Sequence, residues 1–207
     1  MKTFKTALIA TAVLTVLTGV VYPIAVWGIA QVIFPNQAGG SLVVAGNKVV
    51  GSSLIGQNFS APRYFQGRPS AAGDKGYAAD NSGGSNLGPT NKALIDAVKL
   101  RLKNVVESNP GTDAHQVPID LVTASGSGLD PEISPAAADL QVARVAHARS
   151  LSEDQVRQLI AESTRPRSAG IFGEPGVNVL LLNLALDRAT ASHSARAAGS
   201  HGGTPGT

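Results

Sequence analysis

"ALIATAVLTVLTGVVYPIAVWGIAQVIF", residues 7–34, decides the architecture of this chain, because it is apolar at almost every position and carries no charge. A membrane-spanning helix needs about 20 predominantly apolar residues, and this stretch is longer. Its threonines are tolerable in lipid because their hydroxyls can bond the preceding turn of backbone. The stretch therefore predicts one transmembrane helix, with a mild bend at Pro23, since proline lacks a backbone N–H.

The charges that flank residues 7–34 predict how the helix is oriented. Lys2 and Lys5 precede it, whereas no acidic residue occurs before Asp74. Cytoplasmic flanks of membrane helices are enriched in Lys and Arg. We therefore expect residues 1–6 in the cytoplasm and residues 35–188 outside it.

A secretory signal that is removed after export is the alternative to a retained anchor. Small residues near Ala30 would suit cleavage, but the apolar core of a signal usually spans about 7–15 residues. The greater length of residues 7–34 favours an anchor, and cleavage would instead yield a secreted binding domain. Either way, the folded part of the chain lies outside the cytoplasm.

Composition excludes several classes of protein. Charged residues make up 15% of the chain, below the usual quarter, as expected if part of it lies in a membrane. The net charge is only +3, and Lys2 and Lys5 supply two of those charges, so nothing indicates a nucleic-acid partner. Because there is no cysteine, disulfides, thiolate metal sites and a cysteine nucleophile are excluded.

Residues 35–188 combine short β-favouring runs with helical patterns, which indicates a small α+β domain. Two such runs in residues 42–50 surround Gly46-Asn47 and predict a hairpin, and residues 51–59 continue in a strand-like pattern.

Residues 61–91 are rich in Gly, Pro, Ser and Asn, which predicts a long segment without regular structure. Such segments are usually functional or disordered. Tyr64, Phe65 and Tyr77 argue against disorder, because they are apolar anchors.

The remaining patterns predict helices and one strand. Helices are expected over residues 91–108, 134–149 and 152–163, and a strand over residues 119–123. The first helix would have Leu94, Val98, Leu102 and Val105 on one face. The second would begin at Ser134-Pro135, and the third at a capping box formed by Ser152 and Gln155. The apolar run 177–188 reads as a buried helix capped by Asn178 or as a buried strand. Residues 189–207 have nothing to pack and predict a disordered tail.

No catalytic, cofactor-binding or metal-binding pattern is present in the sequence. The chain lacks the Walker and Rossmann glycine patterns and the G-x-S-x-G elbow, and its histidines are scattered. In "LVTASGSGLDPEISPAAA", residues 121–138, Gly126 and Gly128 would let the backbone approach a neighbour closely. Asp130 and Glu132 could form an acid/base pair, but a turn before a helix start explains both carboxylates more simply.

Four blocks of this sequence together resemble one family. They are "GSSLIGQNFSAPRYFQGRPSAA" (51–72), "NSGGSNLGPTN" (81–91), "PIDLVTASGSGLDPEISPAAADLQVARVA" (118–146) and "GEPGVNVLLLNLALD" (173–187). In order and spacing they are similar to the KdpC family, the C subunit of the bacterial potassium-transporting Kdp P-type ATPase. With the apolar helix, the resemblance covers about residues 5–188.

The resemblance implies an inner-membrane complex in which this chain is not catalytic. Its implied partners are a channel-like potassium-translocating subunit, a P-type ATPase subunit that carries the phosphorylated aspartate, and a small single-span subunit. ATP and potassium are then used by the complex. The family's C subunit has also been proposed to assist nucleotide binding, but the predicted orientation separates residues 35–188 from cytoplasmic ATP.

Ten residues are candidates for contacts with these partners. They are Tyr64, Phe65, Arg68, Ser85, Asn86, Ser125, Ser127, Asp130, Glu132 and Arg144. Solvated surface positions are the simpler expectation for Arg63, Arg68, Arg144 and Arg149. At Glu132 the sequence departs from the family pattern, which often has His after "GLDP", and such an exchange suits a polar turn or a partner contact better than catalysis.

The main hypothesis is therefore a non-catalytic accessory subunit that is needed for assembly of the complex and covers the outer potassium entrance. One alternative is a membrane-anchored extracytoplasmic hydrolase that uses Ser125, Ser127, Asp130 and Glu132. The other is the secreted binding domain that cleavage near Ala30 would release.

Overall fold

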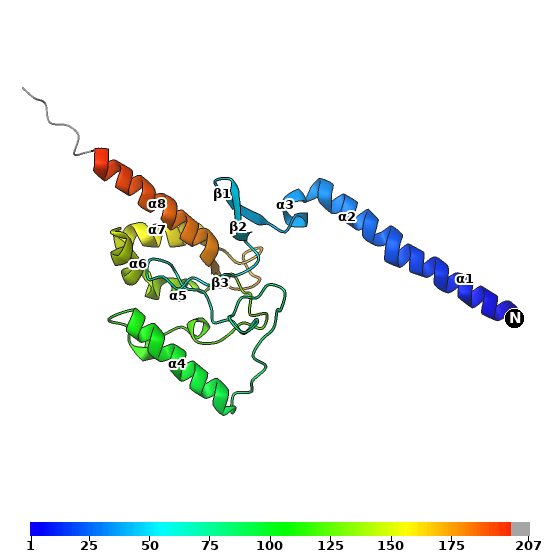
Figure 1. The fold of residues 1–207 in the computed structure, drawn as a ribbon, viewed down its shortest axis with the longest axis horizontal. Coiled ribbons are helices and arrows are strands. Elements are labelled where there is room, and N and C mark those ends of the chain that lie inside the picture. The colour runs from blue at the N-terminus through cyan, green and yellow to red at the C-terminus, as the bar shows by residue number, and fades with distance from the viewer. Residues whose placement is uncertain (200–207) are drawn as a thin grey trace, which may run out of the picture. The chain divides into compact units, whose positions relative to one another are not determined.

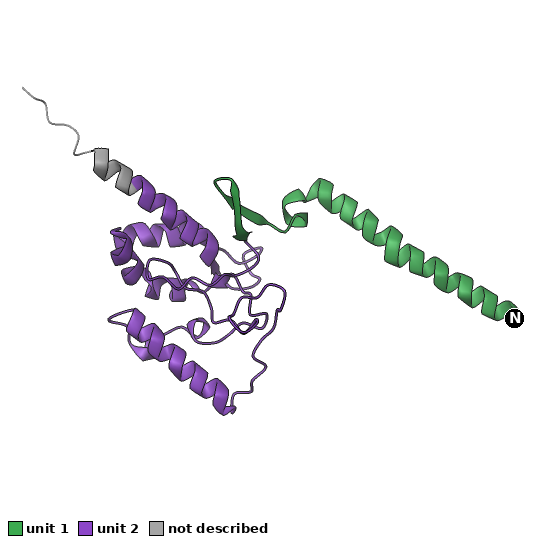
Figure 2. Cartoon of the chain, in the orientation of Figure 1, with its two compact units in different colours: residues 1–52 green, residues 53–207 purple. Residues whose placement is uncertain are grey.

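The computed structural model describes residues 1–199, and the side chains of residues 1–192. The chain forms two compact units, residues 1–52 and the part that begins at Ser53, which are coloured separately in Figure 2.

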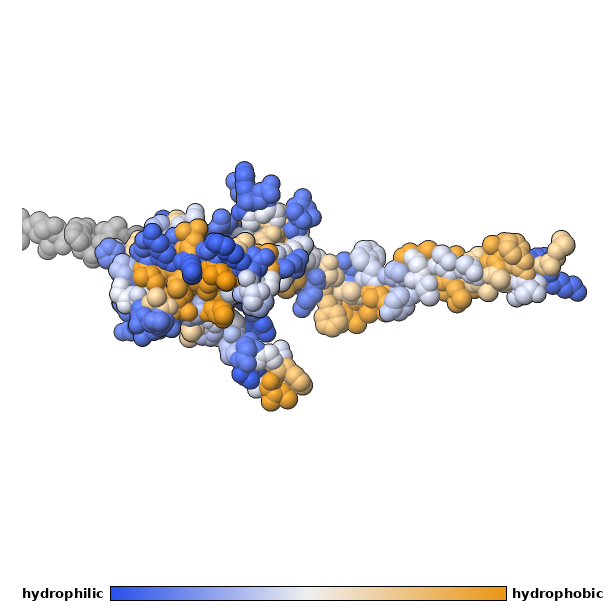
Figure 3. Space-filling view, turned by 90° about the horizontal axis from the view of Figure 1, so that it is seen from below, coloured by the Kyte–Doolittle hydropathy of each residue, from blue (hydrophilic) through white to orange (hydrophobic). Residues whose placement is uncertain are grey.

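The first unit begins with a continuous helix over Lys2–Ile33, as the sequence predicts. It comprises α1 (Lys2–Val16), a π-helical turn (Leu17–Val21) and α2 (Tyr22–Ile33). The helix has 32 residues, its most apolar window of 18 residues has a mean hydropathy of 2.1, and none of that window is buried, so hydrophobic side chains line its outside (Figure 3). A helix of this length and composition can cross a membrane.

The π-helical turn lies directly before Pro23, where the sequence predicts a bend. Pro23 has no N–H to donate to the carbonyl of Gly19, and a local change of helix type accommodates the missing bond. Thr18 returns its hydroxyl to the carbonyl of Leu14 at 2.7 Å, as expected of threonine in an apolar helix.

A short helix, α3 (Pro35–Ala38), and the predicted hairpin complete the first unit. Strands β1 (Leu42–Ala45) and β2 (Lys48–Ser52) pair in antiparallel fashion through a turn in which Gly46 has a φ of +60°. The strand-like continuation predicted over residues 51–59 is confirmed for Gly51 and Ser52 and wrong from residue 53, because β2 ends at Ser52.

The second unit is an α+β domain, as predicted, in which several helices accompany a small sheet (Figure 1). Three antiparallel strands form that sheet in the order β3-β5-β4. Its elements are α4 (Lys92–Ser108), the 3₁₀ turns η2 (Ala114–Gln116) and η3 (Ile119–Leu121), β3 (Glu132–Ile133), α5 (Pro135–Leu140), α6 (Val142–Arg149), α7 (Glu153–Ser163), β4 (Thr164–Arg165), β5 (Gly176–Asn178) and α8 (Val179–Gly199).

The core of this domain lies between the sheet and helices α5 to α8. Val145, Val156, Leu182 and Leu186 are fully buried there. Phe65 joins them from residues 53–91, which contain no helix or strand. The predicted long irregular segment is therefore packed into the core by its aromatic anchor, rather than lying free.

The predicted helix starts are confirmed by their caps. Asn91 caps α4, Ser134 caps α5, Ser152 and Gln155 form the capping box of α7, and Asn178 accepts a hydrogen bond from the N–H of Leu181. These caps satisfy N–H groups that have no partner within the helix. Both readings of residues 177–188 are partly right, because β5 ends at Asn178 and α8 begins at the next residue.

Two other predictions from local pattern are wrong. Residues 119–123 contain the 3₁₀ turn η3 instead of a strand. Residues 134–149 form two helices, which are separated at Gln141. In both places a side chain makes long-range hydrogen bonds: Asp120 binds Ser134, and Gln141 binds the backbone of Gln66.

The disordered tail predicted from residue 189 is wrong for residues 189–199, because α8 continues to Gly199. The alanines of this stretch have the highest helix propensity and extend a helix that is already anchored by packing at its start. Residues 200–207 of the predicted tail lie outside the described part of the chain.

Candidate functional site

The glycine-rich part of the motif stretch (residues 121–138) is held by the long segment (residues 53–91). Ser70 makes the central contact: its hydroxyl donates to the carbonyl of Gly128 at 2.6 Å and accepts from the N–H groups of Ala72 and Tyr77, at 3.1 and 2.7 Å. One side chain therefore fixes the turn of the long segment and binds it to the motif stretch.

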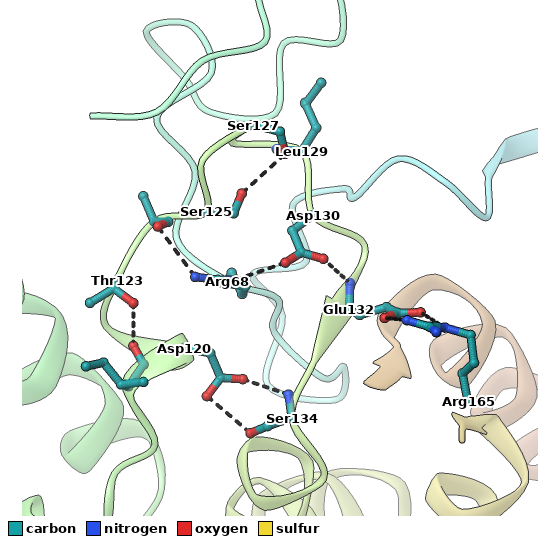
Figure 4. A network of polar contacts seen from close by, with 12 residues as sticks. Arg68, Asp120, Thr123, Ser125, Ser127, Leu129, Asp130, Glu132, Ser134 and Arg165 are labelled. Atoms are coloured by element: carbon teal, nitrogen blue, oxygen red, sulfur yellow. Dashed lines mark hydrogen bonds and ion pairs between the residues drawn. The ribbon is translucent and has the colours of Figure 1, made fainter. Parts of the chain in front are cut away.

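Arg68 forms the second link between the two segments. Its guanidinium is 3.0 Å from a carboxylate oxygen of Asp130 and donates to the carbonyl of Ala124 at 3.5 Å (Figure 4). The Tyr77 hydroxyl donates to the carbonyl of Arg68 at 2.5 Å. Asp130 is therefore neutralised by an arginine of its own domain.

Glu132 lies two residues further on, and its carboxylate is paired with a different arginine. Both of its oxygens accept from Arg165, at 2.9 and 2.7 Å, while the N–H of Glu132 donates to Asp130 at 3.0 Å (Figure 4). The two carboxylates thus pair with different arginines, Asp130 with Arg68 and Glu132 with Arg165.

Asp120 fixes the C-terminal part of the motif stretch by binding Ser134. It accepts from the N–H and the hydroxyl of Ser134, at 2.7 and 3.2 Å, while the same hydroxyl accepts from the N–H of Ala137 to cap α5. The 3₁₀ turn η3 presents Asp120 to Ser134, and this contact explains why residues 119–123 do not form a strand.

A second cluster fixes the aromatic part of the long segment. The side-chain amide of Asn183 accepts from the N–H of Phe65 at 2.9 Å and donates to its carbonyl at 3.0 Å. Gln141 binds the N–H and carbonyl of Gln66 in the same way, at 2.8 and 3.2 Å. The two buried amides thus satisfy the backbone groups of residues 65–66, which have no neighbouring strand. The hydrogen bonds of Gln141 also explain the break between α5 and α6 at this residue.

Two arginines that the sequence assigned to solvated surface positions are instead part of this cluster. Arg149, whose side chain is 0% exposed, donates to the carbonyl of Arg63 at 2.6 Å, lies 2.9 Å from Asp187 and stacks 4.8 Å from the centre of the Tyr64 ring. Arg144 donates to Asn109, Gln141 and the carbonyls of Pro62 and Tyr64, and burial lowers its pKa. Surface placement is therefore wrong for Arg149 and Arg144.

The structure brings together eight of the ten candidate residues in these two clusters. Arg68, Ser125, Ser127, Asp130 and Glu132 belong to the first, and Tyr64, Phe65 and Arg144 to the second. Ser127 is exposed, but its hydroxyl bonds the N–H of Leu129 and, at 3.5 Å, the hydroxyl of Ser125. Ser85 and Asn86 lie apart from both clusters, on an exposed part of the long segment.

Several residues of both clusters have no counterpart among the sequence candidates. Ser70 stands in a loop whose pattern gives no sign of its partners, Tyr77 was expected only as an apolar anchor, and Arg165 pairs with a residue far away in the chain. Asn183 did carry a signal, because it is the one amide in the apolar run "VLLLNLAL" and a buried polar group requires a partner.

The two serines of the motif stretch that could act as nucleophiles are held by local hydrogen bonds. Ser125 and Ser127 contact each other and backbone, and no described histidine, lysine or carboxylate bonds to either hydroxyl. In the part of the chain that the structure describes, no group of three or more His, Cys, Asp and Glu side chains is arranged to hold a metal ion.

Tyr77 gives this region a testable dependence on pH. Burial, and secondly the charge of Asp130, raise the pKa of Tyr77 to about 12. The folded state therefore favours the protonated phenol, and its contribution to stability is complete below the unfolded pKa of about 10 and is lost as the pH rises to about 12. Urea unfolding of the chain in detergent should show a free energy of unfolding that falls over this range, and Tyr77→Phe should reduce the slope.

A second tyrosine substitution provides the control for this prediction. Tyr22→Phe, at an exposed position of α2, should leave the pH dependence as it is in the unmodified chain. Equal slopes for Tyr77→Phe and the unmodified chain would contradict the assignment to Tyr77.

Fold and site together define a class of protein: a small α+β domain behind one apolar helix, whose most distinctive loops are internally braced. The family model described as "K+-transporting ATPase, c chain" (KdpC) matches residues 4–188. The chain is 57% identical over 188 residues to the potassium-transporting ATPase KdpC subunit of Variovorax paradoxus, covering 91% of this chain and 97% of the relative. The protein of the same name from Rhodospirillum rubrum is 57% identical over 187 residues, covering 90% and 96%, and that from Polaromonas naphthalenivorans 58% over 183 residues, covering 88% and 93%. The chain belongs to the KdpC family.

Proposed function

We propose that this chain is a non-catalytic accessory subunit of an ATP-driven, high-affinity potassium-uptake complex. The observation that carries the proposal is that the polar groups of the motif stretch bind other parts of the same domain: Asp130 binds Arg68, Glu132 binds Arg165, and Ser134 binds Asp120 and caps α5. In a family whose members are named as ATPase subunits, this favours a shaped assembly surface over a reaction centre.

The helix Lys2–Ile33 would anchor the subunit in the bacterial inner membrane. Lys2 and Lys5 at its start favour a cytoplasmic N-terminus and a periplasmic domain. There the domain would brace the channel-like potassium-translocating subunit and cover its outer potassium entrance, beside the P-type ATPase subunit and the small single-span subunit.

In this proposal the complex consumes ATP and moves potassium, while this chain itself holds neither. Assistance to nucleotide binding would require the domain to meet cytoplasmic ATP, and the charges at the start of the helix favour the opposite side. The proposed contribution to transport is assembly.

Deletion of the gene tests the proposal. Growth at micromolar external potassium should fail and should return when the gene is supplied on a plasmid, while growth at millimolar potassium serves as the control. A tagged copy should also bring down a large multi-span protein and a P-type ATPase. Normal growth of the deletion strain, with an intact pump complex, would overturn the proposal.

A further inference from the structure

The connection between β4 and β5, which we call the finger (residues 165–176), exposes two large apolar side chains at its end. The side chain of Ile171 is 69% exposed and that of Phe172 is 67% exposed. Single exposed apolar residues are common on protein surfaces, but an adjacent aliphatic and aromatic pair on a projecting turn is a typical contact site.

Backbone bonds give the finger a defined shape. Ser168 and Phe172 exchange two hydrogen bonds, at 2.8 and 2.9 Å, and the N–H of Gly170 donates to the carbonyl of Arg167 at 3.1 Å. Ala169 has a φ of +53°, a left-handed conformation that a residue with a Cβ adopts at a cost. The pair at the end is therefore presented by a preformed turn, so that little conformational entropy is lost on binding.

The base of the finger is fixed by two ion pairs. Arg165 binds Glu132 through two hydrogen bonds, and Arg167 lies 2.6 Å from Glu174. Gly176 leaves room for the first pair, because a Cβ at this position would lie 2.3 Å from a carboxylate oxygen of Glu132. Glu132, the residue that departs from the family pattern, thus supports the finger from within the domain.

The charge around Ile171 and Phe172 indicates what kind of partner the finger fits. A turn that inserts into an anionic lipid surface gains from unpaired Lys and Arg beside its apolar tip. Both arginines of the finger are already neutralised, by Glu132 and Glu174. An apolar tip with two paired charges at its base is compatible with the buried centre and polar rim of a protein interface.

We propose that the finger docks into an apolar pocket of another protein subunit of the complex, with Phe172 as the main anchor and Ile171 beside it. This inference rests on the proposed function and adds to it the surface by which the domain is held. The partner is defined by its chemistry: a concave apolar pocket whose rim can accommodate the Arg165–Glu132 and Arg167–Glu174 pairs.

Competition inside the cell tests the finger. A tagged Phe172→Ser chain and a differently tagged unmodified chain are co-expressed with the other subunits, and their ratio in the complex purified in detergent is divided by their ratio in whole membranes. We expect the unmodified chain to be enriched about 30-fold, which corresponds to about 2 kcal/mol. Leu100→Ser, at a position 61% exposed on α4, is the matched control and should compete about equally.

The outcomes separate the two proposals. A ratio near one for Phe172→Ser, or equal losses for Phe172→Ser and Leu100→Ser, would overturn the finger while leaving the accessory-subunit proposal intact. If the unmodified chain captures no ATPase subunit, the proposed function fails and the finger with it. Because Phe172 is exposed, thermal unfolding of Phe172→Ser should match that of the unmodified chain, so that a loss of capture reports binding.

A crosslink identifies the occupant directly. The chain contains no cysteine, so Phe172→Cys provides one site in it for a benzophenone label. Irradiation should join it to another subunit of the complex, whereas Leu100→Cys should give no such product. Crosslinking of Phe172→Cys to lipid alone, or to a second copy of this chain, would overturn the assignment.

Discussion

Replacing Gly128 with alanine should destabilise the second unit by about 3 kcal/mol, and the same replacement at Gly126 should not. Gly128 has a φ of +67°, and a Cβ there would lie 2.7 Å from both the N of Ala72 and the carbonyl oxygen of Gly83. Left-handed backbone costs a residue with a Cβ roughly 1–2 kcal/mol, and overpacking typically costs a further 1–3 kcal/mol. Because both contacted atoms belong to backbone, no side-chain rotation relieves the clash.

Gly126 is the matched control, two residues earlier in the same stretch. It has no heavy atom within 4 Å of a built Cβ and no positive φ, so alanine should change stability little or raise it by up to about 1 kcal/mol, since it restricts the unfolded chain. Urea unfolding in detergent, followed by far-UV circular dichroism, measures both variants. Equal free energies of unfolding for the two would contradict the close packing of the long segment on Gly128.

The pair of glycines also shows how far the sequence could predict this site. The pattern "GSGLDP" indicated that backbone would approach something closely, but only the fold reveals that Gly128 does so and Gly126 does not. The partner of Gly128 lies in residues 70–83, more than 40 residues earlier in the chain, and no local pattern encodes such a contact.

Local features, in contrast, were predictable. The apolar helix, the hairpin turn at Gly46 and the caps at Asn91, Ser134 and Ser152 depend on neighbouring residues alone, and all are confirmed. The errors at residues 119–123 and 134–149 arose where long-range bonds override local propensity, as when Asp120 binds Ser134.

Arg149→Ala should have the other large effect, a loss of about 3–5 kcal/mol from the free energy of unfolding. Its guanidinium joins α6 to α8 through Asp187 and Thr190, and to the long segment through the carbonyl of Arg63 and the ring of Tyr64. Removal of the fully buried guanidinium leaves the carbonyl of Arg63 without its donor, which costs about 1–3 kcal/mol, whereas Asp187 is 39% exposed and keeps Tyr64 and Arg63 as partners. Truncation also leaves a cavity where the aliphatic part of the side chain was packed.

Arg157 on α7 provides a stringent control for this prediction. It lies near three carboxylates, those of Asp139, Glu153 and Asp154, so counting ion pairs would rank it above Arg149. Its side chain is 48% exposed, however, and exposed pairs are screened by water and contribute little. Arg157→Ala should therefore leave urea unfolding nearly unchanged.

Two further substitutions separate the roles of charge and packing at position 149. Arg149→Met keeps most of the apolar volume, so it should recover part of the stability lost in Arg149→Ala, while the carbonyl of Arg63 still lacks its donor. Arg149→Lys restores the charge. A single ammonium group, however, cannot reach Arg63, Thr190 and Asp187 at once, as the planar guanidinium does. Both variants should thus fall between Arg149→Ala and the unmodified chain. If Lys restored full stability, charge alone would suffice, and the proposed role of the fixed guanidinium geometry in joining α6, α8 and the long segment would be wrong.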